Sequence, residues 1–137
     1  MKRDLSRIRE ILLKCEGSES VWFDLIFHWP GYDEPQHSVS SPWNESDQYQ
    51  IALMEDAGLV EIKRKQDHDN EGFVFAREFR LTHSGHDYLD AIRDQGIWAK
   101  TKATVADTGG SATLEIVKSL AIGYLKKKIS TATDIEL

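Results

Sequence analysis

Two runs of alternating apolar and polar residues constrain this chain more than any other feature. Residues 59–64 alternate, and residues 73–81 alternate again, with phenylalanine or leucine at most of the apolar positions of the second run. A period of two is typical of a strand that buries one face. Residues 65–72, which join the runs, are almost all polar. Two such strands around a polar tip predict a β-hairpin.

Segments with helical periodicity lie on both sides of this hairpin. In each of them apolar residues recur at spacings of three and four, as on one face of a helix. The expected helices are residues 4–15, residues 47–57, residues 82–95, a shorter one at residues 98–106, and a long one at residues 113–129. A short first strand is expected near residues 21–24, where β-branched and aromatic residues cluster.

This order of elements predicts an α+β fold, a winged helix-turn-helix with an appended C-terminal helix. We expect a winged-helix domain at residues 1–95 and a short helix with a glycine-rich connection at residues 96–112. A C-terminal amphipathic helix and tail would follow at residues 113–137. All three prolines fall in residues 28–46, so the conformation of that stretch, and whether it holds a short helix, stays open.

Bulk composition narrows the class of protein. The chain has 137 residues, of which 40% are hydrophobic, and these values suit one globular domain. Its single cysteine, Cys15, excludes an intrachain disulfide and falls on the apolar side of a predicted helix, so we expect a buried thiol. No apolar run approaches the length of a membrane span, and no signal peptide is evident. We therefore expect a cytoplasmic protein with no membrane partner.

In a winged helix one helix enters the major groove of double-stranded DNA and the hairpin, or wing, contacts the backbone. Residues 47–57 occupy the position of that recognition helix. Its early polar residues are the candidates for base contacts, because glutamine can pair with adenine. Basic residues at the wing are the candidates for phosphate contacts. The predicted DNA-binding residues are Gln48, Tyr49, Gln50, Lys63, Arg64 and Lys65.

The charge distribution opposes this interpretation. The net charge is −6, and residues 21–72 carry eleven acidic and only three basic side chains. Residues 44–58 contain no lysine or arginine. Two alternatives therefore stay open. The first is a DNA-binding protein, which would act as a homodimer if its C-terminal helix pairs with a second copy. The second is a protein-interaction module that uses its acidic face or a C-terminal helix dimer and binds no DNA.

Several segments carry a resemblance to a known family, among them Trp-Ala-Lys-Thr-Lys at residues 98–102, the Gly-Gly-Ser break at residues 109–111, and three longer runs. The longer runs are Met-Lys-Arg-Asp at residues 1–4 with Ile-Arg-Glu-Ile-Leu at residues 8–12, Met-Glu-Asp-Ala-Gly-Leu-Val at residues 54–60, and Leu-Thr-His-Ser-Gly-His-Asp-Tyr-Leu-Asp-Ala-Ile-Arg-Asp at residues 81–94. The chain resembles a family of uncharacterised bacterial and prophage-associated proteins of unknown function. The resemblance implies an accessory or regulatory role and supplies no catalytic residues. The proline-rich residues 28–46 depart from the family's pattern.

Motifs for catalysis and for metal binding are missing from the sequence. It has no glycine-rich phosphate loop, no nucleophile elbow and no paired-cysteine motif. His83 and His86 are three residues apart, which would suit one side of a metal site, but no second ligand pair accompanies them. We therefore interpret both histidines as structural. The sequence predicts a protein that is not an enzyme and needs no cofactor or metal.

Overall fold

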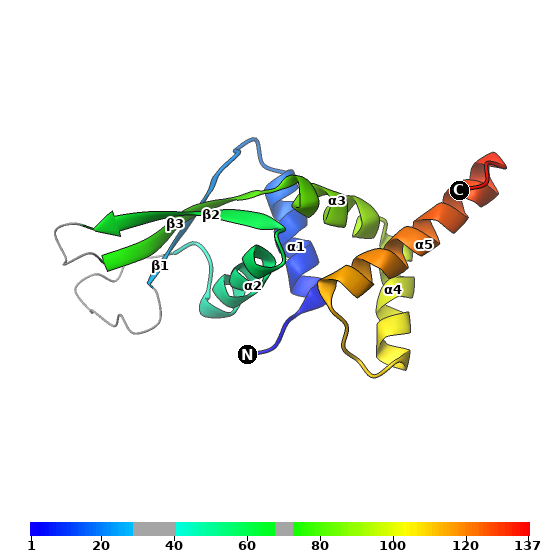
Figure 1. Cartoon of the computed structure of the whole chain (residues 1–137), viewed down its shortest axis with the longest axis horizontal. Coiled ribbons are helices and arrows are strands. Elements are labelled where there is room, and N and C mark those ends of the chain that lie inside the picture. The colour runs from blue at the N-terminus through cyan, green and yellow to red at the C-terminus, as the bar shows by residue number, and fades with distance from the viewer. Residues whose placement is uncertain (29–40, 68–72) are drawn as a thin grey trace. The chain divides into compact units, whose positions relative to one another are not determined.

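The computed structural model describes residues 1–28, 41–67 and 73–137 (Figure 1). Within these residues the chain forms helices and one three-stranded antiparallel sheet, as the predicted α+β class requires. It divides into two compact units, Met1–Gly85 and His86–Leu137. The elements are α1 (Leu5–Glu16), β1 (Phe23–His28), α2 (Glu45–Asp56), β2 (Val60–Asp67), β3 (Phe73–Leu81), α3 (His83–Ile92), α4 (Gln95–Asp107) and α5 (Leu114–Thr133).

The sheet contains the predicted hairpin. Strands β2 and β3 pair antiparallel, with Ile62 opposite Phe79, and β1 pairs with the other edge of β3, which gives the order β1-β3-β2. The first strand begins at Phe23, two residues later than expected, and runs on to His28. The tip at residues 68–72 and most of the proline-rich stretch, including any helix in it, lie outside the described residues.

The last three predicted helices have different limits in the structure. The single helix expected at residues 82–95 ends at Ile92, and α4 begins at Gln95. The reason is local, because the Asp94 carboxylate accepts a hydrogen bond from the backbone N–H of Ile97 at 2.9 Å and so caps a new helix. The last helix extends to Thr133, past the predicted end at residue 129.

Aromatic side chains form the centre of the core in unit Met1–Gly85. Phe79 on β3 is fully buried, and its ring centroid lies 5.4 Å from that of Phe23 on β1. The ring of Trp43 meets Phe79 edge-on at 5.8 Å, and its indole N–H donates to the backbone carbonyl of Asp24 at 3.0 Å. Trp43 is therefore held both by packing and by its one polar group, as a buried tryptophan requires. Cys15 on α1 is buried, as expected, and burial raises the pKa of its thiol to about 12.

The Leu-Thr-His-Ser-Gly part of the family-like motif has a structural role. The backbone N–H of Thr82 donates to the carbonyl of Leu59 at 3.0 Å, and the Thr82 hydroxyl donates to the carbonyl of Gly58. The same hydroxyl accepts from the N–H of Gly85 and so caps α3. A Cβ on Gly85 would lie 2.1 Å from the Leu59 carbonyl oxygen, so only glycine fits. These contacts fix the start of α3 against the turn between α2 and β2.

In unit His86–Leu137, α4 and α5 pack against each other. The first half of α5 is the anchored part, since Leu114, Val117 and Ala121 are buried along one face. Two polar contacts join the helices farther along. The hydroxyls of Thr104 and Tyr124 lie 2.6 Å apart, and the Lys128 ammonium lies 2.7 Å from the Asp94 carboxylate.

Candidate binding surfaces

Gln50 points into the protein rather than outward from α2. The residue is only 1% exposed, and its side-chain amide oxygen accepts a hydrogen bond from the backbone N–H of Asp4 at 2.8 Å. Its amide nitrogen donates to the carbonyl of Lys2 at 2.9 Å. Both polar groups are therefore used to hold the segment before α1 against α2. Burial, rather than a lack of hydrogen-bonding groups, separates Gln50 from the surface on which DNA bases would be read.

The other two candidates on α2 differ from each other. The side-chain amide of Gln48 donates to the carbonyl of Trp43 at 2.9 Å, so this residue tightens the turn into the helix. Tyr49 is 36% exposed and lies on the outer face of α2. Of the three predicted base-reading residues, Tyr49 has the surface position that recognition would need.

The three predicted wing residues also have different surroundings. The guanidinium of Arg64 pairs with the carboxylate of Glu55 through two contacts at 2.7 and 2.6 Å, and this partner raises the arginine's pKa. The ammonium of Lys63 lies 4.9 Å from the Trp22 ring centroid and 3.9 Å from a Glu78 oxygen. Lys65 is exposed on β2. Arg64 is thus neutralised by the very helix that would enter the groove.

A second ion pair neutralises the first turn of α2. The guanidinium of Arg7 on α1 contacts both oxygens of the nearly buried Asp47 carboxylate, at 2.7 and 2.8 Å. This fork-on-fork geometry is the strongest arrangement for such a pair. The hydrogen bonds from Arg7 hold the pKa of Asp47 below its ordinary value, although partial burial opposes the shift. Sequence reasoning missed this pair, since the two residues lie 40 positions apart and no periodicity links them.

These internal pairs define what α2 still presents to its surroundings. One stripe follows helical spacing and consists of the exposed Glu45, Tyr49 and Asp56 with the half-buried Ala52 and Leu53. We call this set the α2 stripe. An acidic residue stands at each end, and an aromatic and two aliphatic side chains lie between them. The stripe holds no basic side chain.

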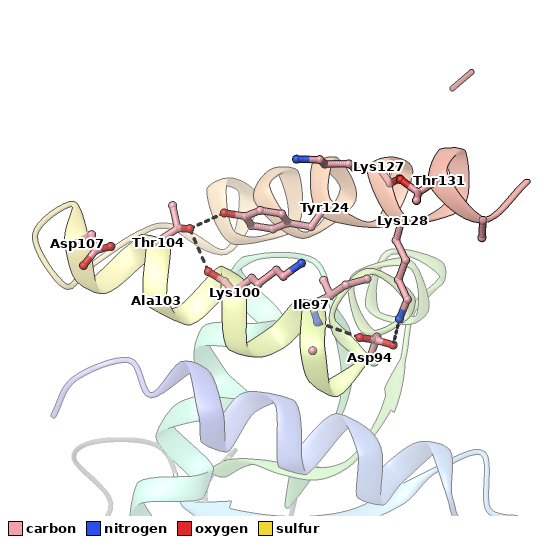
Figure 2. A pocket seen from close by; sticks show the side chains of 12 residues that line it. Asp94, Ile97, Lys100, Ala103, Thr104, Asp107, Tyr124, Lys127, Lys128 and Thr131 are labelled. Atoms are coloured by element: carbon pink, nitrogen blue, oxygen red, sulfur yellow. Dashed lines mark hydrogen bonds and ion pairs between the residues drawn. The ribbon is translucent and has the colours of Figure 1, made fainter. Parts of the chain in front are cut away.

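A groove of about 740 Å³ lies between α4 and α5 (Figure 2). Ile97, Ala103 and Tyr124 contribute apolar surface to it, and a hydrogen bond between the hydroxyls of Tyr124 and Thr104 joins its walls. Its volume falls within the range of small-ligand and peptide pockets. No pattern in the sequence predicts this groove, because it depends on how two helices pack and not on a motif.

Three lysines line the α4–α5 groove, and only one of them is paired. Lys128 contacts Asp94, and this contact lowers the pKa of that carboxyl group. Lys100 on α4 and Lys127 on α5 both line the groove and have exposed side chains. Neither has an acidic partner among the residues that the structure describes. The lining as a whole holds three lysines against two aspartates, Asp94 and Asp107, and so has a small basic excess over an apolar floor.

The described residues form neither a metal site nor a membrane-spanning helix. Over residues 1–28, 41–67 and 73–137, no three residues of the histidine, cysteine, aspartate and glutamate types gather closely enough to hold a metal ion, and this includes His83 and His86. None of the helices described in the structure has the length and apolar character needed to cross a membrane.

Comparison with known proteins places these features in a family. The model of a family described as "Hypothetical protein (DUF2513)" matches residues 2–111, and so covers α1 through α4 but not α5. An uncharacterised protein of Haemophilus influenzae is 31% identical over 122 residues, which are 88% of this chain and 92% of that protein. No solved structure matches the chain. On the extent of the family match and on this relative, the chain belongs to the DUF2513 family of hypothetical proteins.

Proposed function

We propose that this chain is a non-enzymatic accessory or regulatory protein of prophage type, which acts in the cytoplasm by binding and whose first unit is a winged helix. The support is the order of its described elements: a helix, a strand, a helix and an antiparallel hairpin, with the sheet order β1-β3-β2. In this order α2 takes the recognition-helix position and β2 with β3 forms the wing. Fold alone does not choose the target, so the choice depends on the surface.

The chemistry of the α2 stripe favours a protein over DNA as the target. A helix that enters a DNA groove lies close to phosphates, and affinity for them comes from lysine and arginine. Here Glu45 and Asp56 stand at the two ends of the α2 stripe. The nearby Arg7 and Arg64 form ion pairs with Asp47 and Glu55, and their charge is therefore neutralised. An apolar centre with an acidic border instead matches a protein surface that has an apolar patch bordered by lysine or arginine. We infer such a protein as the partner of unit Met1–Gly85.

DNA binding by the wing is the competing function, and one observation favours it. Lys63 and Lys65 are exposed on β2 and could approach phosphates even if α2 does not. Fluorescence anisotropy with a random DNA duplex at about 50 mM salt separates the two functions, because the electrostatic contribution is large at low salt. We expect no binding by the natural chain. Salt-dependent binding that Lys63→Ala with Lys65→Ala abolishes would overturn the protein-target proposal.

A charge-reversal variant tests whether the stripe itself is the obstacle to DNA. Glu45→Lys with Asp56→Lys should bind the same duplex at least about tenfold more tightly than a control with the same net charge. Glu19→Lys with Glu115→Lys is that control, since both glutamates are exposed and lie outside the α2 stripe. Equal binding by the two variants would show that only net charge matters and that the stripe has no special role.

The protein target is tested with a photo-crosslinking amino acid at position 49. We expect crosslinks to a protein with basic surface residues, and we expect Leu53→Asp to remove them, because a buried charge disrupts an apolar contact. The same amino acid at position 19 is the matched control and should give no such product. Crosslinks that Leu53→Asp leaves unchanged would contradict a role for the α2 stripe.

A further inference from the structure

The α4–α5 groove and the residues that follow α5 are complementary in charge and polarity. Residues 134–137 read Asp-Ile-Glu-Leu, which alternates acidic and aliphatic side chains. In an extended segment, alternate side chains point to opposite sides, so Glu136 lies opposite Ile135 and Leu137, and Asp134 adds a second carboxylate just before them. The groove offers the matching pattern, with an apolar floor and unpaired lysines on its two walls. We call residues 134–137 the tail.

The tail does not occupy the groove of its own chain. Ile135 is 57% exposed and Leu137 is 59% exposed, although both are large aliphatic residues. Asp134 adopts a left-handed conformation with φ 55° and ends α5, so the tail leaves the helix at a turn. Exposed aliphatic residues beside acidic ones, in a chain that also holds an apolar and basic groove, indicate a contact with another molecule.

We propose that the tail of one copy binds in the α4–α5 groove of a second copy, and that the two copies exchange tails reciprocally to form a homodimer. Ile135 and Leu137 lie on the apolar floor formed by Ile97, Ala103 and Tyr124. Asp134 and Glu136 face Lys100 and Lys127, whose long side chains can reach over the rim. A reciprocal exchange uses the same surface on both copies and closes after two, as two-fold symmetry requires.

This homodimer is independent of the protein target proposed for the α2 stripe, because the two surfaces belong to different units. One wall of the groove and the whole tail also lie outside residues 2–111, the part that the family model matches. The tail contact is small, and stable interfaces commonly bury roughly 1,200 Å² or more. We therefore expect a weak dimer with a dissociation constant in the micromolar range, which falls apart as salt screens the lysine–carboxylate pairs.

The test is a charge exchange between groove and tail, followed by sedimentation equilibrium of the full chain. One variant carries Lys100→Glu with Lys127→Glu, and the other carries Asp134→Lys with Glu136→Lys. In each variant alone, tail and groove have like charges, so each should remain at the 15.6 kDa of one chain. In a mixture, both contacts of a heterodimer join opposite charges, and we expect association restored to within about tenfold of the natural chain.

Lys126→Glu is the matched control, because Lys126 is exposed on α5 and does not line the groove. It should dimerise like the natural chain, and far-ultraviolet circular dichroism should show every variant folded. A natural chain that remains monomeric at about 200 μM and low salt overturns the proposal. So does a dimer that survives either double variant, since another surface would then hold it. Binding of the tail to its own groove would appear as a monomer and counts against the proposal in the same way.

Discussion

The two units of this chain treat their charges in opposite ways. In Met1–Gly85, arginines from other elements neutralise the carboxylates at both ends of α2, through Arg7 with Asp47 and Arg64 with Glu55. In His86–Leu137, the facing walls of α4 and α5 keep Lys100 and Lys127 without an acidic partner among the described residues. Internal pairing adds rigidity and removes charge from the surface, whereas unpaired charge beside apolar surface is available for binding. Two carboxylates of α2 in the first unit are thus held in ion pairs, whereas two lysines on the groove walls of the second unit remain unpaired within the described residues.

The largest expected loss of stability comes from a substitution in the core of the first unit. Phe79→Ala should destabilise the protein by about 3–5 kcal/mol, because it removes a fully buried ring that contacts Phe23 and Trp43 and leaves a cavity. Cys15 reports on this unit, since its buried thiol has a pKa of about 12 and reacts only after opening. The rate of thiol labelling at pH 8 should rise by roughly two to four orders of magnitude, the population change that this energy implies.

Ile116→Ala is the control in the second unit, where Ile116 is exposed. It should change the free energy of unfolding by less than about 0.5 kcal/mol and leave the rate of Cys15 labelling unchanged. If Phe79→Ala were as mild as this control, the aromatic cluster would not be the centre of the first unit.

The next effect tests whether the Arg7–Asp47 pair is structural. Arg7→Ala should cost about 1–3 kcal/mol at pH 7, because it leaves a nearly buried carboxylate without its charged donor. Arg93→Ala is the comparison, since the exposed Arg93–Asp90 pair lies within three residues on a helical surface. Surface pairs of that kind contribute about 0.5 kcal/mol or less. Equal losses in chemical denaturation would mean that the Asp47 pair behaves as a surface pair.

The same pair predicts a pH dependence of stability. The lowered pKa of Asp47 means that its ionised form favours the folded state. That contribution is present above the ordinary aspartate pKa of about 4 and is lost as pH falls through the lower folded value. The difference in unfolding free energy between the natural chain and Arg7→Ala should therefore be largest near neutral pH and shrink below about pH 4. A difference that stays constant down to pH 2 would contradict this explanation.

The smallest expected loss of stability comes from removing one hydrogen bond in the second unit. Tyr124→Phe removes the hydroxyl that lies 2.6 Å from the Thr104 hydroxyl across the α4–α5 groove. One hydrogen bond of this kind contributes about 0.5–1.5 kcal/mol. Thr104→Val removes the partner, and the double variant should lose less than the sum of the two single losses, because both remove the same bond. Strict additivity in thermal denaturation would show that the bond does not form in solution.

Local signals in the sequence were enough for most elements. The alternation in residues 73–81 predicted β3 with its observed ends, and the spacing of apolar residues predicted α1, α2 and α5. The errors occurred where two local signals compete. Apolar spacing continued past Ile92, but the carboxylate of Asp94 ended that helix and started the next. Glycine at position 85 was recognised within a family-like motif, yet its reason, the approach of the Leu59 carbonyl, is visible only in the structure.

The candidate sites were less predictable than the fold. Glutamine is usually exposed and tyrosine is more often partly buried, but on α2 the helical turn buries Gln50 and exposes Tyr49. Arg64 is a basic residue on the hairpin, which by itself suggests a contact with phosphate. Only the packing of α2 beside β2 revealed its partner Glu55. The α4–α5 groove had no signal, because none of its lining residues forms a motif by itself.

The sequence by itself determined the kinds of element, their order and the excess of acidic residues, because these follow from periodicity, capping and counting along the chain. The tertiary structure decided which charges are used internally and which remain available at the surface. The physical reason is that an ion pair or a groove depends on distances between residues far apart in sequence, as in the 40 positions between Arg7 and Asp47. Packing sets those distances, and no local pattern records them.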